Sequence, residues 1–248
     1  MFKHVYNGIK AYTSAFELIS KLKLWRYFFI PIAISVITAA VIGVSAYIFS
    51  DNIVDFLSSI VPWNIDNEWV TGILRFVFAI FIIGISLILY KHIIMALSAP
   101  FMSPVSEKIE IHLLNKNHIH RNTSFHQQLW RGIRINIRNL FMELWLTVVI
   151  LLVSLIPLIG WFTSILLFVI QAYYAGFGNM DYTLERHFNY KKSVSFVRRH
   201  RGIAIGNEIV FMLFLLIPVV GIILVLPLSV TAASIITLKV LSVEKQIH

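Results

Sequence analysis

Two stretches of the chain, Ile156-Pro157-Leu158-Ile159-Gly160 and Ile217-Pro218-Val219-Val220-Gly221, each lie near the middle of a long uncharged block. The blocks, residues 144–175 and 209–238, hold about 30 residues each. One membrane-spanning helix needs about 20 apolar residues, and two need about 40 plus a turn. Each block is therefore too long for one ordinary span and too short for two.

The proline and glycine within each block favour a reversal of the chain there. Proline removes a helix donor, and glycine permits a left-handed turn. Limbs of about 15 residues reach only about 22 Å, short of a hydrocarbon core about 30 Å thick. The pattern predicts two re-entrant helical hairpins, residues 141–176 and 204–240, with breaks at Pro157, Gly160, Pro218 and Gly221. The alternative is one kinked, tilted span at each place.

The composition excludes an ordinary water-soluble protein. Hydrophobic residues make up 58% of the 248 residues and charged residues 13%, whereas a soluble domain has about 25% charged residues. The chain has no cysteine, which excludes disulfides and thiol nucleophiles. We expect an all-α integral membrane protein.

Charge and hydropathy divide the part of this single membrane domain before the first hairpin into five segments. Residues 1–26 form a basic amphipathic helix of the kind that lies in the membrane interface. Two apolar segments, 27–49 and 70–98, are long enough to span. The acidic loop between them, 51–69, is assigned to the outer side by the positive-inside rule. Pro100 and Pro104 interrupt or redirect the chain, and 99–140 then forms cytoplasmic helices.

The segment between the two hairpins supports their re-entrant topology. Residues 177–203 are rich in lysine and arginine, so we expect them to be cytoplasmic, like 99–140. If residues 144–175 crossed the membrane once, this basic segment would face outside.

The hairpins also form a weak internal repeat. Arg131-Gly132-Ile133 and Glu143 precede the first, and Arg201-Gly202-Ile203 and Glu208 precede the second. Paired broken segments often flank the substrate path of a transporter. Duplication of a purely structural hairpin explains the repeat equally well.

No motif indicates an enzyme or a cofactor. Walker A, H-E-x-x-H and G-x-S-x-G patterns are absent from the sequence. His118 and His120 lack a third ligand at useful spacing, and Gly176-Phe177-Gly178 suits close helix packing better than phosphate binding. Cytoplasmic topology explains the basic residues, so we expect no nucleic-acid partner.

Cations near helix ends are the remaining candidates for binding chemistry. Arg26 directly precedes the first span, where a guanidinium and free backbone N–H groups suit an oxyanion. The alternative for Arg26 is an interfacial arginine that reaches toward the headgroups. A second group consists of acidic and basic residues that could form ion pairs around a polar vestibule. The alternative is that they simply face solvent. The residues are Glu107, Glu110, Arg131, Arg134 and Arg138.

The order of these motifs resembles the CysZ sulfate permeases, part of a wider family that includes the etoposide-induced eukaryotic membrane proteins. The motifs are Arg26-x-Phe28-x-x-Pro31, Ala99-Pro100-Phe101 with Glu107 and Glu110, the two I-P-x-x-G stretches and, between them, Asp181-Tyr182. The resemblance implies a bacterial inner-membrane protein with two transmembrane helices and two hemi-penetrating hairpins. It also implies homo-oligomers in the lipid membrane, and sulfate uptake that feeds cysteine biosynthesis. CysZ proteins carry G-x-R before the first span, and Leu24-Trp25-Arg26 stands there in this chain.

We therefore predict a channel or permease for sulfate or a related oxyanion that does not hydrolyse ATP. Two spans and two half-hairpins are too little to enclose a pore, which also predicts a homo-oligomer. The alternative is a membrane scaffold or adaptor protein of the wider family that transports nothing.

Overall fold

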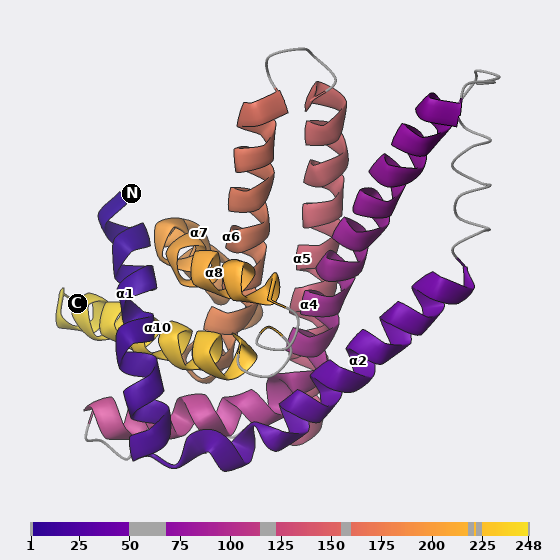
Figure 1. The fold of residues 1–248 in the computed structure, drawn as a ribbon. Coiled ribbons are helices and arrows are strands. Elements are labelled where there is room, and N and C mark those ends of the chain that lie inside the picture. The colour runs from indigo at the N-terminus through magenta and orange to yellow at the C-terminus, as the bar shows by residue number, and fades with distance from the viewer. Residues whose placement is uncertain are drawn as a thin grey trace.

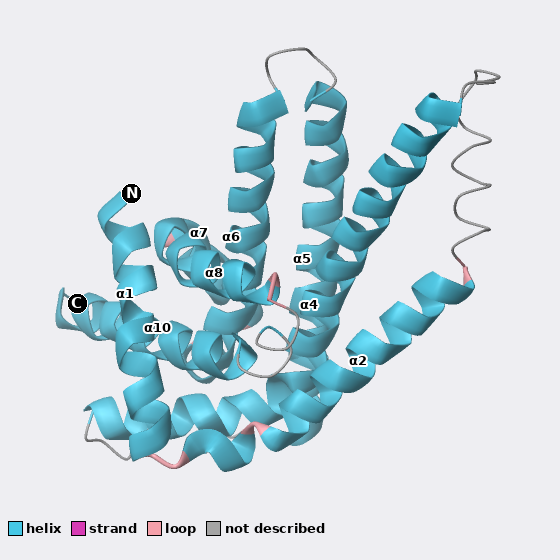
Figure 2. Cartoon of the chain, viewed as in Figure 1, coloured by secondary structure: helices cyan, strands magenta, loops and turns pink. Residues whose placement is uncertain are grey.

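The computed structural model describes residues 2–49, 68–114, 123–154, 160–217, 221 and 225–247, and these residues are almost entirely helical (Figure 2). The elements are α1 (Phe2–Lys21), the short 3-10 helix η1 (Leu24–Tyr27), α2 (Phe29–Ile48), α4 (Glu68–Leu114), α5 (Phe125–Ser154), α6 (Gly160–His187), α7 (Tyr190–Arg199), α8 (Arg201–Leu215) and α10 (Val225–Ile247). Five described helices contain a stretch long and apolar enough to cross a membrane: α2, α4, α5, α6 and α10. The predicted all-α membrane class is confirmed.

The N-terminal helix α1 packs against α8 and α10 through its small side chains (Figure 1). Ala11 and Ala15 are buried, whereas Tyr6 and Phe16 are exposed. Gly8 lies directly against the backbone of α8 around Gly206. The face of α1 that contacts the protein is thus the small-residue face, and its two exposed aromatic rings point away.

The second predicted span does not end at residue 98, because α4 continues through Pro100 and Pro104 to Leu114. Figure 1 shows α4 changing direction between its purple first part and its magenta last part. Side chains of α6 hydrogen-bond the backbone near this bend: Tyr182 Oη donates to Met95 O at 2.6 Å, and an Arg186 guanidinium nitrogen donates to Ser103 O at 3.1 Å. Neighbouring side chains of this kind allow proline inside membrane helices.

The two apolar blocks each fold as a pair of helices, and both pairs are longer than the predicted hairpins. In the first pair, α5 and α6 lie side by side and antiparallel (Figure 1). Gly160 is the first residue of α6, while Pro157 lies outside the described residues. Because α5 begins at Phe125, residues 125–140 belong to the same helix as the first limb and do not form a separate cytoplasmic helix.

The second pair consists of α8 and α10, which also contact each other. The first limb, α8, ends at Leu215, two residues before the predicted break, and Pro218 lies outside the described residues. Gly221 is buried and close to the backbone of α8. The second limb, α10, continues beyond residue 240 to Ile247. At 15 residues, α8 is about 22 Å long.

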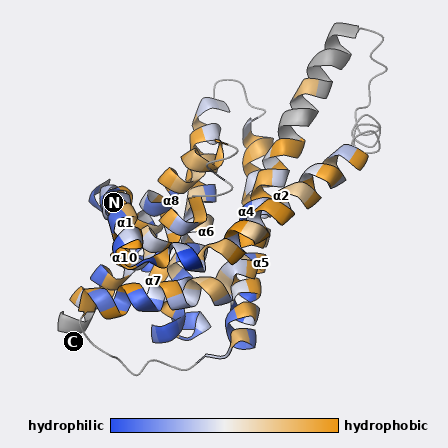
Figure 3. Cartoon of the chain, turned by 60° about the horizontal axis from the view of Figure 1, so that its bottom comes forward, coloured by the Kyte–Doolittle hydropathy of each residue, from blue (hydrophilic) through white to orange (hydrophobic). Residues whose placement is uncertain are grey.

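The predicted basic segment 177–203 consists of a buried part at the end of α6 and a part with exposed charges on α7. The C-terminal part of α6 is almost wholly buried from Tyr174 to Arg186, so it lies in the protein core. The exposed charges are on α7, which buries Phe196 and Val197 on its other face. Figure 3 shows hydrophobic residues over α2 and the adjoining part of α4, and hydrophilic residues gathered over α1 and α7.

Candidate functional site

The predicted anion residues lie in the turn that joins α1 to α2. Lys23 adopts a left-handed conformation (φ 52°, ψ 42°), and the 3-10 helix η1 follows it directly. Leu24 is fully buried, and the Trp25 ring packs edge-on against Phe16 and Phe28, with centroid distances of 6.1 and 6.3 Å. Leu24 and Trp25 therefore anchor the turn in the protein.

Arg26 is the exposed member of this turn, and a second cation lies near it. Its Nη2 donates to Tyr27 Oη at 3.2 Å, and its guanidinium carbon is 5.0 Å from the centre of the Tyr27 ring. Lys108 Nζ, from α4, is 5.4 Å from the same ring centre. Two cations from distant parts of the sequence thus share one aromatic side chain at the start of the first span. Sequence reasoning missed Lys108, which follows Glu107 in the quoted motif.

Four of the five predicted vestibule residues, all except Glu107, contact residues outside this set. Glu107 is exposed, whereas Glu110 is buried against α6. Arg134 lies over the Tyr190 ring at 4.4 Å, and Arg138 over the Phe177 ring at 5.5 Å. Contacts of Glu110 and Arg131 lead into a network of buried polar side chains.

Arg131 joins α5 to α6 and α7. Its Nε and Nη2 donate to the two carboxylate oxygens of Asp181 at 2.8 and 2.7 Å, which is a bidentate pair. Nη1 donates to Phe188 O at 2.8 Å, and Nη2 donates also to Ser193 Oγ at 2.7 Å. The guanidinium is therefore held from both sides and fixes the end of α6 against α7.

Glu110 and Arg186 form a second buried pair, between α4 and α6. Arg186 Nη2 lies 3.2 Å from Glu110 Oε2 and donates to Ser106 Oγ at 2.8 Å. Ser106 is itself 2.6 Å from Thr183 Oγ1, and Ser234 Oγ of α10 donates to Ser106 Oγ at 3.0 Å. These hydroxyls extend the network across three helices.

The third group consists of Lys91, His92 and Glu143, which are all buried. Lys91 Nζ is 2.5 Å from Glu143 Oε1, and His92 Nε2 is 2.9 Å from Glu143 Oε2. His92 Nδ1 lies 3.2 Å from Asn136 Oδ1. Lys91 is 1% exposed and Glu143 not at all. Each of these residues lies inside a helix that is apolar enough to span a membrane.

Glu208 of α8 is a further buried acid, and it is held by amides. Asn179 Nδ2 and Asn207 Nδ2 each donate to Glu208 Oε1 at 2.7 Å, and Asn179 Nδ2 also donates to Ser229 Oγ at 3.0 Å. Glu208 is completely buried. Both acids of the predicted internal repeat, Glu143 and Glu208, therefore lie in the core.

Ionisable residues inside membrane helices are energetically costly and generally mark functional sites or paths. Two weak signals of this network are visible in the sequence. Lys91-His92 follows an apolar run, and Glu143 and Glu208 directly precede the two long blocks. Among the described residues, no group of three histidine or acidic side chains is arranged to hold a metal ion. His118 and His120 lie outside the described residues.

Comparison with known families agrees with this multi-pass, all-helical membrane architecture. The family model described as "Sulfate transporter CysZ/Etoposide-induced protein 2.4" matches residues 11–226. A search of curated proteins gave no match. The match covers the turn at Arg26, the first broken apolar block, the break in the second block, and the buried network except for its residues on α10. On this basis, the chain belongs to the CysZ/etoposide-induced protein 2.4 family, a transporter-type family of membrane proteins.

Proposed function

We propose that this protein carries sulfate or a related oxyanion across the bacterial inner membrane into the cytoplasm, where the sulfate feeds cysteine biosynthesis. The observation that supports this most directly is the pair of cations, Arg26 and Lys108, on the Tyr27 ring. An exposed guanidinium donates two parallel hydrogen bonds to an oxyanion, and an ammonium adds a second positive charge. Family membership supports the anionic substrate.

Passage through the protein would follow the buried polar network. In this structure the cations of the network are engaged by carboxylates, Lys91 by Glu143 and Arg186 by Glu110. An anion would displace a carboxylate partner at each step, and this exchange would keep a desolvated cation from remaining unpaired. The network thus provides positive charge in the membrane without exposing it to lipid.

The energy for uptake would come from outside this chain. A divalent anion that enters against about −100 mV requires roughly 4.6 kcal/mol, from about 2.3 kcal/mol per charge. The sequence carries no nucleotide-binding motif. Rapid consumption of sulfate in the cytoplasm, or co-transport of protons, would supply this energy.

The test is uptake of radiolabelled sulfate into proteoliposomes that contain the full chain. Hydrogen bonds to a charged group contribute about 1.5–3 kcal/mol. We therefore expect Arg26→Ala to raise the half-saturating sulfate concentration by roughly 10- to 100-fold. Arg199→Ala, which removes an exposed arginine of α7, is the matched control and should leave uptake unchanged. Wild-type flux no greater than that of empty vesicles would refute the proposal and leave the scaffold role.

We also propose that the two broken blocks are re-entrant, with both ends of each hairpin on the cytoplasmic side. For the second block, the 15-residue length of α8 supports this, because a helix of about 22 Å does not cross a core of about 30 Å. The exposed positive charges of α7, between the hairpins, fit the cytoplasmic side.

Cysteine labelling tests this topology, and the cysteine-free chain needs no prior substitutions. Lys192→Cys, on the exposed face of α7, should react with a membrane-impermeant maleimide only after the cells are opened. Asp55→Cys, in the predicted outer loop, should react on intact cells. Labelling of Lys192→Cys from outside would contradict the re-entrant arrangement.

The transporting unit in this proposal is a homo-oligomer. If both hairpins are re-entrant, only two complete spans remain in each chain. Two spans enclose no aqueous path alone, so neighbouring copies would complete the wall of the path. Mass measurement of the purified protein in detergent should give a dimer or a higher oligomer. A strictly monomeric protein that still transports sulfate would contradict this point.

A further inference from the structure

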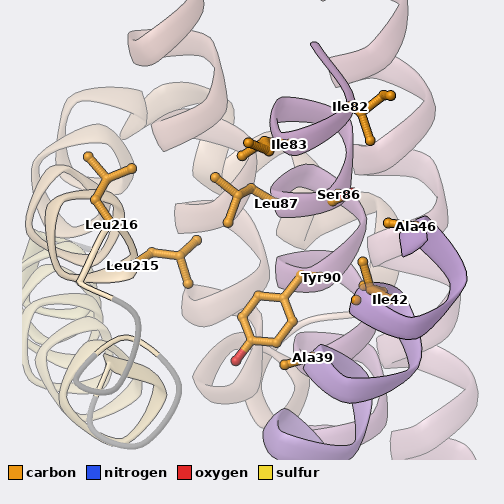
Figure 4. Close-up of a pocket in the computed structure, with 11 residues that line it drawn as sticks. Ala39, Ile42, Ala46, Ile82, Ile83, Ser86, Leu87, Tyr90, Leu215 and Leu216 are labelled. Atoms are coloured by element: carbon orange, nitrogen blue, oxygen red, sulfur yellow. The ribbon is translucent and has the colours of Figure 1, made fainter. Parts of the chain in front are cut away.

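A cavity of about 480 Å³ lies on the face of α4 between α2 and α8 (Figure 4). Eleven described residues line it, and among these the only side-chain polar atoms are the hydroxyls of Ser86 and Tyr90. Ile83 and Leu216 are more than half exposed and mark its open side, whereas Tyr90 and Leu215 are almost fully buried at its inner wall. The cavity is thus a deep apolar pocket that opens to the surface.

The wall contributed by α2 explains why the space is open. Ala39, Gly43 and Ala46 line the cavity, and a Cβ built at Gly43 would meet no atom within 4 Å. Small residues at this spacing usually bring two membrane helices together. Here α2 and α4 diverge with distance from the point where they cross (Figure 1). The small residues of α2 therefore deepen a pocket and do not form a tight contact with α4.

The surroundings of the cavity determine what can fill it. Both α2 and α4 are apolar enough to span, and the outward faces of α2 carry large exposed side chains such as Val41 and Val44. Hydrocarbon is therefore the medium at this depth. An apolar cavity of this kind does not hold water stably, because water needs two to four polar partners.

The volume of the cavity discriminates between two possible apolar occupants, a helix of a second copy and a lipid acyl chain. One turn of an α-helix, about 10 Å wide and 5.4 Å high, fills roughly 420 Å³. A helix of a second copy would thus place little more than one turn in a cavity of about 480 Å³. The size matches that of single small ligands, for which pockets of about 300–1,000 Å³ are typical. None of the described lining residues is charged, so a polar headgroup would remain outside.

We propose that this cavity binds one acyl chain of a membrane phospholipid, which separates α2 from α4. The acyl chain enters past Ile83 and Leu216 and reaches Tyr90 and Leu215. This site is distinct from the turn at Arg26 and does not depend on anion transport.

The test uses the full chain in vesicles of phosphatidylcholine that carries a diazirine near the end of one acyl chain. After illumination, mass spectrometry locates the labelled residues. We expect label on Tyr90 and Leu215, which bulk lipid does not reach because they are 5% and 6% exposed. Absence of label from both residues, while exposed residues such as Val44 are labelled, would overturn the proposal.

Two substitutions on α2 separate the pocket from ordinary lipid contact. Gly43→Phe fills the cavity, and Val44→Phe adds the same ring on the lipid-facing side. Gly43→Phe should reduce label on Tyr90 about tenfold, equivalent to about 1.4 kcal/mol of binding free energy, and Val44→Phe should not. Equal labelling in the two variants would refute the site, as would cross-links from Tyr90 to a second copy.

Ser86→Leu narrows the cavity from α4 and serves as a second variant if Gly43→Phe does not fold. Size-exclusion chromatography and circular dichroism identify a folded variant. A folded Ser86→Leu protein with undiminished label on Leu215 would also count against the acyl-chain site.

Discussion

Substitution of Glu143 by glutamine tests whether the buried network carries its charges in pairs. Glutamine keeps the size of Glu143 and can still hydrogen-bond Lys91 and His92, but it removes the negative charge. Lys91, which is 1% exposed, would then be a buried cation without its carboxylate partner. Removal of one member of a buried ion pair costs about 3–5 kcal/mol, and the retained hydrogen bonds place this variant near the lower end, about 3 kcal/mol.

The assay is reversible unfolding in detergent micelles, followed by tryptophan fluorescence. For a chain of this size, 1 kcal/mol corresponds to roughly 2–4 °C in Tm, so Glu143→Gln should lower Tm by about 6–12 °C. Glu107→Gln is the matched control, because Glu107 is exposed, and its Tm should stay within about 2 °C of the wild type.

A double variant completes the cycle. Lys91→Met combined with Glu143→Leu removes both charges and fills the same space with apolar atoms, an exchange that is often neutral in proteins. We expect the double variant to be more stable than Glu143→Gln alone. Two results would show that Lys91 and Glu143 do not function as a charge pair. Glu143→Gln could be as stable as Glu107→Gln, or the separate effects of Lys91→Met and Glu143→Leu on the free energy of unfolding could simply add up to that of the double variant.

Three further substitutions test the packing around this network. Arg131→Lys loses the two-pronged contact with Asp181 and should destabilise the protein by about 2–3 kcal/mol in the same unfolding assay. Gly206→Ala should lower stability by about 1–3 kcal/mol, because a Cβ at that position would overlap the backbone of Val5 in α1. Asn189→Ala removes the N-cap of α7 and should cost about 1 kcal/mol, seen as lower helical signal and lower Tm.

Each substitution has a control of the same chemistry. Arg134→Lys alters an arginine stacked on Tyr190 and should cost less than Arg131→Lys. Gly84→Ala places its Cβ in open space and should be tolerated. Asn189→Asp keeps a capping oxygen and should match the wild type. Equal effects within any of these pairs would contradict the contact assigned to that residue.

The sequence was sufficient for the apolar helices because their signal is local. An uncharged run with a central proline and glycine predicts a pair of helices from composition and length alone. The same reasoning ended the second span at residue 98 and predicted that Pro100 and Pro104 interrupt or redirect the helix, whereas α4 continues through both prolines and changes direction. The stabilising donors at that bend, Tyr182 and Arg186, come from α6, more than 80 residues later in the chain.

The buried network could not be predicted because its partners are far apart in sequence. Arg131 and Asp181 are 50 residues apart, and Lys91 and Glu143 are 52 residues apart. A charged residue whose partner is unknown is reasonably assigned to a solvated surface, as 177–203 was. The helical pairing that buries Asp181 against Arg131 is visible only in three dimensions.

The two acids of the internal repeat show how far the duplication extends. Glu143 and Glu208 are both fully buried in the first helix of their pair. The donors differ, however: Lys91 supplies a positive charge to Glu143, whereas the amides of Asn179 and Asn207 supply none to Glu208. A repeat kept only for packing would not need a carboxyl group in the core of either half, since a buried polar group without functional use costs stability. In the proposed transport function, the cation on the path would therefore lie on the side of the first hairpin, at Lys91.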